Sequence, residues 1–255
     1  MEYDSFNRSD AQGRTFHANS GQSIGGLPIG IVVLDLWYPY LPGNVANATS
    51  YDFPVHYKVL EGCTGPMILE ADEALLDPII EAGREFQQQG IRALVGACGY
   101  FANYQREVSA ALDIPVFLSS LLQAPMIHRS LKPDQSVGIL FADATAVTDH
   151  MLESCGVTED IPVEYLGMED QPGFQSILQC TGEIDYDEMQ GDLVNRAREL
   201  VRRFPHVGAI LLECSDMPPF AWAIQQAVGL PMFDFNSLIN WVHYGVVQRR
   251  YEGHL

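Results

Sequence analysis

Two cysteines hold the same place in an internal repeat of this chain. Residues 93–100 align without a gap on residues 209–216, and this match places Cys98 on Cys214. The same offset continues to the proline that opens the next predicted strand in each copy. Copies of one supersecondary unit usually pack about a pseudo-two-fold axis, so equivalent residues face each other across a shared cleft. Two thiols that face each other in this way form an acid/base pair.

Each of these cysteines follows an apolar run that predicts a buried parallel strand, and a helix is predicted to start a few residues later. Parallel sheets bind ligands at the carboxyl ends of their strands. Free N–H groups at a helix start stabilise a thiolate and can hold a carboxylate. Gly99 would let the backbone approach a ligand closely. We therefore expect Cys98 and Cys214 to be reactive. The alternatives are two small buried apolar side chains, or a disulfide in an oxidising compartment that no feature indicates.

Predicted strands and helices alternate along the chain. We expect strands at 29–34, 55–60, 93–97, 115–118, 137–141, 163–165, 209–213 and 232–233. Helices are expected at 72–89, 101–112, 146–155, 187–204 and 219–228, with a short helix after Gly173 and a closing helix from about Ser237. Such alternation implies parallel sheets wound right-handed, so the fold class is α/β.

We expect two domains after a flexible N-terminal arm. The arm covers residues 1–26, which are polar and contain no apolar run. The first α/β domain spans 27–131 and the second spans 132–234. The helix within 235–255 is expected to pack back on the first domain.

Composition excludes several classes of partner. The chain has 33 acidic and 14 basic residues, a net charge of −19, which disfavours nucleic acid. A carboxylate site would have to be made locally positive by backbone amides. No apolar run is long enough for a transmembrane helix, and the N-terminus does not resemble a signal peptide. We expect a soluble, cytoplasmic protein without a membrane partner.

The sequence predicts neither a metal site nor a cofactor. The five cysteines contain no C-x-x-C pair and the seven histidines show no metal-ligand spacing. Lys58 and Lys132 are the only lysines, and neither lies in a glycine loop that could cradle the phosphate of pyridoxal phosphate. No glycine-rich nucleotide motif is present.

The stretches Gly96-Ala-Cys98-Gly-Tyr100 and Leu212-Glu-Cys214-Ser215-Asp216 resemble the aspartate/glutamate racemase superfamily. The resemblance implies two pseudo-symmetric parallel-sheet domains flanked by helices, an active site in the cleft between them, no cofactor, and a homodimer or homotetramer. It also implies that one thiolate removes the proton next to a carboxylate while the other thiol delivers a proton to the opposite face. The superfamily's amino-acid racemases usually carry Asn-Thr after the first cysteine, where this chain has Gly99-Tyr100.

A second set of stretches resembles the branch that contains the algal dimethylsulfoniopropionate lyases and their bacterial relatives. These stretches are Tyr38-Pro-Tyr-Leu-Pro-Gly43-Asn44, Cys98-Gly-Tyr100 with Gln105, Pro115-Val-Phe-Leu-Ser119-Ser120-Leu, Glu169-Asp-Gln-Pro-Gly173-Phe174 and Glu213-Cys214-Ser-Asp-Met-Pro218-Pro219-Phe220. Such a lyase removes the same kind of proton and expels dimethyl sulfide. Its sulfonium cation would suit an aromatic box, for which the candidates are Trp37, Tyr38, Tyr40, Tyr100 and Tyr104. The alternative for these rings is ordinary loop packing.

The further candidates for contact with a small carboxylate substrate are the two residues after each cysteine and five side chains in loops or at strand or helix ends. They are Gly99, Tyr100, Ser215, Asp216, Thr145, Asp35, Tyr38, Ser119 and Ser120. Asp35, Thr145 and the two serines could equally serve as turn or cap residues.

We expect a cofactor-independent enzyme that uses Cys98 and Cys214 to move a proton alpha to a carboxylate. Racemisation or epimerisation of an acidic amino acid of the aspartate/glutamate type, or of a related carboxylate, is the first candidate on the breadth of the superfamily. The alternatives are the dimethylsulfoniopropionate lyase reaction and a non-catalytic carboxylate-binding protein.

Overall fold

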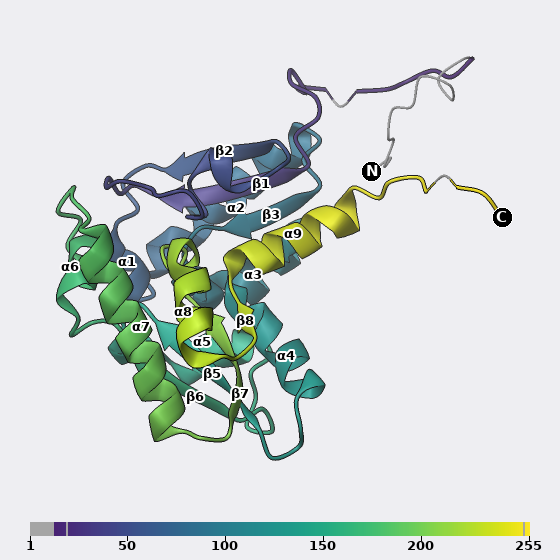
Figure 1. Cartoon of the computed structure of the whole chain (residues 1–255). Coiled ribbons are helices and arrows are strands. Elements are labelled where there is room, and N and C mark those ends of the chain that lie inside the picture. The colour runs from purple at the N-terminus through teal and green to yellow at the C-terminus, as the bar shows by residue number, and fades with distance from the viewer. Residues whose placement is uncertain (1–12, 19, 252) are drawn as a thin grey trace.

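The computed structural model describes residues 13–18, 20–251 and 253–255, which form two four-stranded parallel sheets. The first contains β1 (Ile29–Leu34), β2 (Val55–Leu60), β3 (Ala93–Gly96) and β4 (Val116–Phe117) in the order β2-β1-β3-β4. The second contains β5 (Ser136–Phe141), β6 (Val163–Gly167), β7 (Val207–Leu212) and β8 (Met232–Phe233) in the order β6-β5-β7-β8. The shared order confirms the prediction of two pseudo-symmetric sheets (Figure 1).

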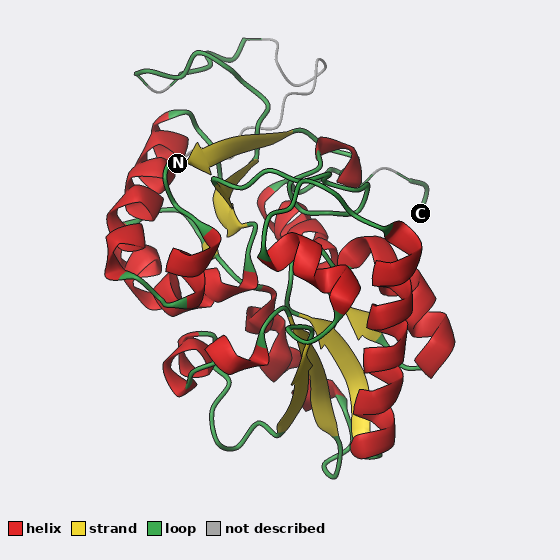
Figure 2. Ribbon diagram, turned by 90° about the vertical axis from the view of Figure 1, so that its left-hand side faces the viewer, coloured by secondary structure: helices red, strands yellow, loops and turns green. Residues whose placement is uncertain are grey.

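Helices flank both sheets (Figure 2). The α-helices are α1 (Gly65–Leu69), α2 (Leu76–Gln88), α3 (Gln105–Ala111), α4 (Ala124–Ser130), α5 (Asp149–Ser154), α6 (Pro172–Leu178), α7 (Tyr186–Arg203), α8 (Ala221–Val228) and α9 (Phe235–Val246). Every residue of β1, β3, β5 and β7 is buried, which explains why these strands read as continuous apolar runs.

The core is continuous between the two sheets. One apolar cluster extends from the α2 face of the first sheet through the second sheet, and a separate cluster lies between the other face of the first sheet and α9. In this second cluster Phe235, Leu238 and Ile239 pack against Ile31 and Val95. The chain thus finishes its second sheet and returns to the first, and α9 lies beside β3 (Figure 1).

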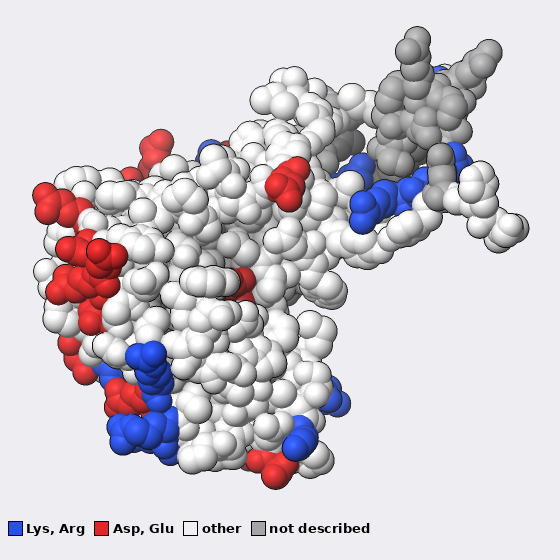
Figure 3. Space-filling view, in the orientation of Figure 1, with Lys and Arg blue, Asp and Glu red and all other residues white. Residues whose placement is uncertain are grey.

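A glycine near the start of each first strand lets a helix approach the sheet. A Cβ on Gly30 would lie 2.4 Å from the ring of Phe86 in α2. The equivalent Gly138 would place one 2.8 Å from Leu200 in α7. The helix α7 is capped by Asp185 and has acidic residues in its first turn and arginines in its last, as the helix dipole favours (Figure 3).

Several predicted element bounds were wrong. The helix expected at 101–112 begins directly after Cys98 as the 3-10 helix η3 (Gly99–Tyr104) and continues as α3. The helix expected at 219–228 begins in the same way as η6 (Pro218–Phe220) before α8. The tight turn needed to leave a buried strand end favours 3-10 geometry there. The short helices α1 and α4 have too few residues to give a clear period, and the sequence did not reveal them.

Four further 3-10 helices lie in the connections among strands and α-helices. They are η1 (Ala48–Ser50), η2 (Glu73–Leu75), η4 (Ser120–Gln123) and η5 (Ala144–Ala146), and η4 and η5 closely follow the ends of β4 and β5. The helix expected at 146–155 begins only at Asp149, because Thr148 caps it through the Met151 amide. Asp72 caps η2, as the sequence indicated for this region.

The predicted arm and domain bounds stay predictions. Residues 1–12 and 19 of the arm lie outside the described residues, and the described part up to Gly26 contains no helix or strand. In the described part of the chain, no helix has the length and apolar content to cross a membrane.

Candidate active site between the two sheets

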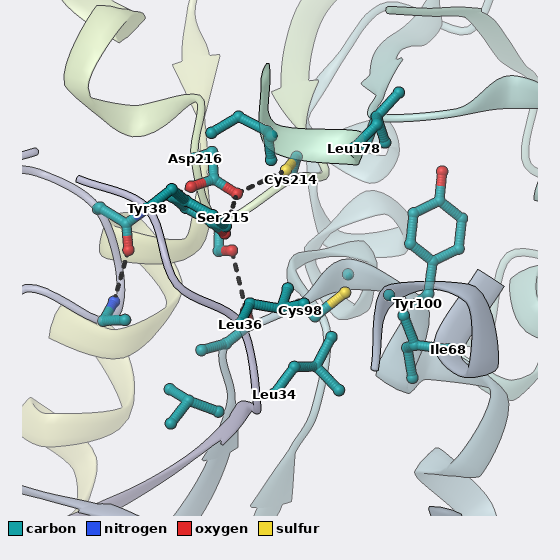
Figure 4. A pocket seen from close by; sticks show the side chains of 18 of the residues that line it. Leu34, Leu36, Tyr38, Ile68, Cys98, Tyr100, Leu178, Cys214, Ser215 and Asp216 are labelled. Atoms are coloured by element: carbon teal, nitrogen blue, oxygen red, sulfur yellow. Dashed lines mark hydrogen bonds between the residues drawn. The ribbon is translucent and has the colours of Figure 1, made fainter. Parts of the chain in front are cut away.

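A cavity of about 70 Å³ lies between the two halves, and both Cys98 and Cys214 line it (Figure 4). A space of this size holds several waters or part of a small ligand. Its other lining residues are Val33, Leu34, Leu36, Tyr38, Tyr40, Asn44, Ala46, Gly65, Ile68, Leu69, Ala97, Gly99, Tyr100, Ala142, Ile177, Leu178, Glu213, Ser215 and Asp216. The repeat therefore brings its two cysteines to one cavity at the carboxyl ends of β3 and β7.

Each cysteine is held at a fixed turn after its strand. Cys98 has extended backbone and is the N-cap of η3, with the Phe101 amide donating to its carbonyl at 3.2 Å. After β7 the Met217 amide donates to the carbonyl of Cys214 at 3.3 Å. The Ser215 hydroxyl donates across the interface to the Ala97 carbonyl at 2.9 Å, which ties the two turns together (Figure 4).

Asp216 is the centre of a buried hydrogen-bond network. Its Oδ1 accepts from Asn44 Nδ2 at 2.5 Å, and its Oδ2 accepts from the Tyr38 hydroxyl at 3.2 Å and from Cys214 Sγ at 3.5 Å. Burial raises the pKa of Asp216 to about 6, and these hydrogen bonds act in the opposite direction. Asp216 is therefore ionised at neutral pH beside the Cys214 thiol.

Glu213 is a second acid in the lining and is fully buried. Its Oε2 accepts from the Ala142 amide at 3.4 Å, while Oε1 has no hydrogen-bond partner in the described structure. Burial raises the pKa of Glu213 to about 8, so this side chain holds its proton at neutral pH.

The expectation of a stabilised thiolate was wrong for the free protein. Burial is the largest effect and raises the pKa of both thiols well above the usual value. Glu213 adds to this at Cys98, and Asp216 adds to it at Cys214. The amides of Tyr100 and Phe101 lower the pKa of Cys98, as predicted, but too little to compensate. Both cysteines are therefore neutral thiols at neutral pH in the free protein.

Three of the five aromatic candidates line the cavity: Tyr38, Tyr40 and Tyr100. The rings of Tyr38 and Tyr40 lie 4.7 Å apart. The Tyr100 hydroxyl donates to the carbonyl of Asp143, and this bond joins the turn after β3 to the turn after β5. The two other candidates are not in the lining. Trp37 is 70% exposed on the surface, and the Tyr104 hydroxyl donates to the Asp72 carbonyl.

Four predicted contact residues lie outside the lining. Asp35 is exposed and accepts from the Gly62 amide, and Thr145 is exposed and donates to Asp143. Ser119 caps η4 through the Leu121 amide. The buried hydroxyl of Ser120 donates to the carbonyls of Leu212 and Glu213, so it supports the strand end before Cys214 without reaching the cavity. The contacts of Asp35, Thr145 and Ser119 are those of turn and cap residues, which the sequence analysis gave as the alternative role for them.

Sequence reasoning assigned no role to Asn44 or Glu213. Asn44 belongs to the loop after β1, and it takes its place only when the two halves meet at Asp216. Glu213 had a visible signal, because an acid at the end of an apolar strand is unusual. The described residues contain no group of three or more His, Cys, Asp or Glu side chains arranged to hold a metal ion.

Solved structures show the same fold. Unliganded arylmalonate decarboxylase matches with a TM-score of 0.57 and 14% identity, covering 88% of this chain and 94% of that one. Glutamate racemase from Campylobacter jejuni matches with a TM-score of 0.56 and 15% identity, covering 88% of each chain. Glutamate racemase RacE1 from Bacillus anthracis matches at 0.55 and 13%, covering 87% and 83%. The predicted fold of the aspartate/glutamate racemase superfamily is thereby confirmed.

Curated relatives decide the family. A dimethylsulfoniopropionate lyase of Durusdinium sp. clade D is 31% identical over 217 residues, which cover 81% of this chain and 70% of that protein. The chain belongs to the dimethylsulfoniopropionate lyase family. Dimethylsulfoniopropionate lyase 7 of Emiliania huxleyi is 28% identical, covering 81% of this chain and 63% of that protein. Dimethylsulfoniopropionate lyase 5 of the same alga is 30% identical, covering 84% and 44%.

The chain thus spans between 44% and 70% of the length of these three lyases. No family model matches it. The resemblance to the lyase branch, which the sequence analysis based on short motifs, is confirmed. Membership of this family identifies the chain as an enzyme.

Proposed function

We propose that this member of the lyase family cleaves dimethylsulfoniopropionate into dimethyl sulfide, acrylate and a proton without a cofactor. The observation that carries the proposal is the charge of the cavity lining. Two thiols, two carboxyl groups and three tyrosines line it, with no lysine, arginine or histidine among the described lining residues. This reverses the order of the sequence analysis, which favoured racemisation of an acidic amino acid.

A lining of this kind suits a substrate with a permanent positive charge. Aspartate and glutamate each carry net negative charge, and their second carboxylate would meet the ionised Asp216 without a cationic partner. Dimethylsulfoniopropionate has no net charge, and its sulfonium group gains from an ionised carboxylate and from ring faces. Asp216 with Tyr38 and Tyr40 supplies both.

The same sulfonium group would activate a thiol. In the free protein both thiols are neutral because burial and nearby acids raise their pKa. A unit positive charge about 4 Å from a sulfur contributes about 4 kcal/mol at an effective dielectric constant of 20, which is roughly three pKa units. Substrate binding would therefore lower the pKa of the nearby thiol by about three units and raise its thiolate fraction roughly 1000-fold over that in the empty cavity.

The chemistry then needs one proton transfer and one bond cleavage. A thiolate takes a proton from the carbon next to the carboxylate, and that electron pair forms the new carbon-carbon double bond. The bond between the neighbouring carbon and the sulfonium sulfur breaks, and its pair returns to sulfur. Acrylate and neutral dimethyl sulfide leave, and the proton taken from the substrate restores the neutral thiol of the free protein. The one proton released per turnover is the one that this thiol lost to solvent when the substrate bound.

Racemisation of an acidic amino acid is the second candidate, and one observation favours it. Two thiols line one cavity, as a reaction that removes a proton from one face and adds it to the other requires. A non-catalytic binder would need neither thiol.

One experiment separates these functions. The protein is incubated in heavy water with dimethylsulfoniopropionate, aspartate and glutamate, and dimethyl sulfide release and deuterium uptake are measured. The lyase proposal expects dimethyl sulfide from the first compound. Deuterium exchange into aspartate or glutamate without release of dimethyl sulfide would refute the lyase proposal and support racemisation. If neither signal appears at saturating ligand, the protein would be a non-catalytic carboxylate binder.

Cys98→Ser and Cys214→Ser sharpen the result. A lyase depends on one thiolate base, so the two variants should lose activity to different extents. Equal loss of interconversion in both is the expected behaviour of a racemase.

A further inference from the structure

Glu213 occupies an unusual place for an acid. It follows the last residue of β7, and its own amide donates to the Leu140 carbonyl of β5 at 2.9 Å, which fixes its backbone to the sheet. The side chain is fully buried and lines the cavity. Its Oε1 has no partner in the described structure, although a buried carboxyl oxygen without one is costly. An unpartnered polar atom in a cavity wall points to a ligand that completes it.

The backbone after Cys98, in the other copy of the repeat, lies directly against this carboxyl group. A Cβ on Gly99 would lie 1.8 Å from Glu213 Oε1, so Glu213 lies against the backbone of the Cys98 turn. At the equivalent place in the repeat, the residue before Cys98 is Ala97. The acid therefore belongs to one half and reaches the reactive turn of the other.

We propose that Glu213 is a catalytic residue that stays protonated and donates a hydrogen bond from its carboxyl group to the carboxylate of the substrate. This inference rests on the proposed lyase function and specifies how the substrate lies. The carboxylate end would be at Glu213 and Gly99, and the sulfonium end at Asp216, Tyr38 and Tyr40. The two buried acids would thereby bind opposite ends of one zwitterion, Glu213 as a neutral hydrogen-bond donor to the carboxylate and Asp216 as an anion beside the sulfonium group.

A neutral donor matters most while the proton is being removed. As the carbon next to the carboxylate loses its proton, negative charge moves onto the carboxylate oxygens. A hydrogen bond from a neutral acid in a dry cavity becomes stronger as that charge develops, so it lowers the barrier more than it tightens binding. A buried carboxylic acid that is kept neutral at pH 7 is known to fill such a role. The donor also replaces the cationic side chain that the lining lacks.

The surroundings of Glu213 define its pH response. The titratable groups that face it come from η3, α5 and the turn after β7, and they are Cys98, Tyr100, Cys155, Cys214 and Asp216. Burial raises the pKa of the thiols and of Tyr100 far above neutrality, and the pKa of Asp216 is about 6. Glu213, with a pKa of about 8, is thus the group of this set that titrates just above neutral pH. Its ionisation would remove the donor and place a negative charge beside Cys98.

The test compares three variants of the full chain by dimethyl sulfide release between pH 6 and 10. Glu213→Gln keeps a neutral donor of the same shape, and Glu213→Leu keeps the volume without the donor. Glu169→Gln is the matched control, because Glu169 also accepts from a backbone amide at a strand end of the second sheet but does not line the cavity. Circular dichroism and thermal unfolding check that each variant folds.

We expect Glu213→Gln to retain kcat within about tenfold and to lose the alkaline decline near pH 8. Glu213→Leu should lose about 100-fold or more in kcat, the usual effect of removing one oxyanion donor, with a smaller change in KM. The proposal is overturned if folded Glu213→Gln is as inactive as Glu213→Leu, or if its pH profile matches that of Glu169→Gln. Absence of dimethyl sulfide release from the unaltered protein would instead refute the proposed lyase function.

Discussion

Replacing Asp216 by Asn should make Cys214 more acidic and at the same time weaken substrate binding. Asp216 Oδ2 lies 3.5 Å from Cys214 Sγ, and the carboxylate is ionised at neutral pH because its pKa is about 6. Two negative charges at that distance repel by about 5 kcal/mol at an effective dielectric constant of 20, or roughly 3.5 pKa units as an upper value. The Asn variant keeps an acceptor for the thiol but removes the charge. We expect the pKa of Cys214 to fall by about two units.

The assay is alkylation by iodoacetamide, with the modified cysteine located by mass spectrometry. At pH 8 the variant should modify Cys214 about 100-fold faster than the unaltered protein, since each pKa unit changes the thiolate fraction tenfold. The advantage should shrink below pH 6, where Asp216 is itself protonated. In the same variant KM for dimethylsulfoniopropionate should rise at least tenfold because the sulfonium group loses its anion. Asp35→Asn is the control, since it removes an exposed carboxylate outside the cavity. Equal alkylation rates in the two variants would refute the electrostatic reasoning.

Three further substitutions test the scaffold around the site. Gly99→Ala should lower the free energy of unfolding by about 1–3 kcal/mol and remove most of the activity, because the new Cβ would occupy the place of the Glu213 carboxyl group. Gly191→Ala, on the open surface of α7, is the control and should raise the free energy of denaturant unfolding by about 0.5–1 kcal/mol. Cys180→Ala removes two hydrogen bonds between the thiol and the Trp37 backbone, so KM should rise several-fold in steady-state assays while the free energy of unfolding changes by less than about 1 kcal/mol. An unchanged KM would show that this contact does not shape the cavity. Leu193→Ala in the buried face of α7 should lower the free energy of unfolding by about 2–5 kcal/mol, and a loss below about 1 kcal/mol would contradict the packing described here.

The sequence allowed the two-sheet fold and the two thiols to be predicted because both depend on local order along the chain. A repeated strand, cysteine and helix start is visible in residues 93–100 and 209–216 without knowledge of any distant contact. Capping by Asp72 and the dipole pattern of α7 are local for the same reason. Thr145 lies outside the cavity lining because its hydroxyl donates within its own turn to Asp143, the N-cap of η5, which is the local role that the sequence analysis gave as the alternative.

The chemical state of the site could not be predicted in the same way. The sequence indicated helix amides that stabilise a thiolate, and those amides act as expected on Cys98. Burial, with a further contribution from the neighbouring carboxyl group of Glu213, outweighs them, and neither effect can be predicted from the spacing of residues. Asn44 and Asp216 are far apart along the chain and meet only when the two halves pack together.

The repeat is symmetric in backbone but not in the groups that surround its two sulfurs. Ala97 precedes Cys98 while Glu213 precedes Cys214, and Tyr100 stands where the other copy has Asp216. As a result Cys98 faces a neutral acid from the other half, and Cys214 faces an anion in its own turn. A racemase must run in both directions, so its two thiols exchange the roles of base and acid and gain from matched surroundings. An elimination runs one way and needs one base, and the unequal surroundings of Cys98 and Cys214 support that reaction.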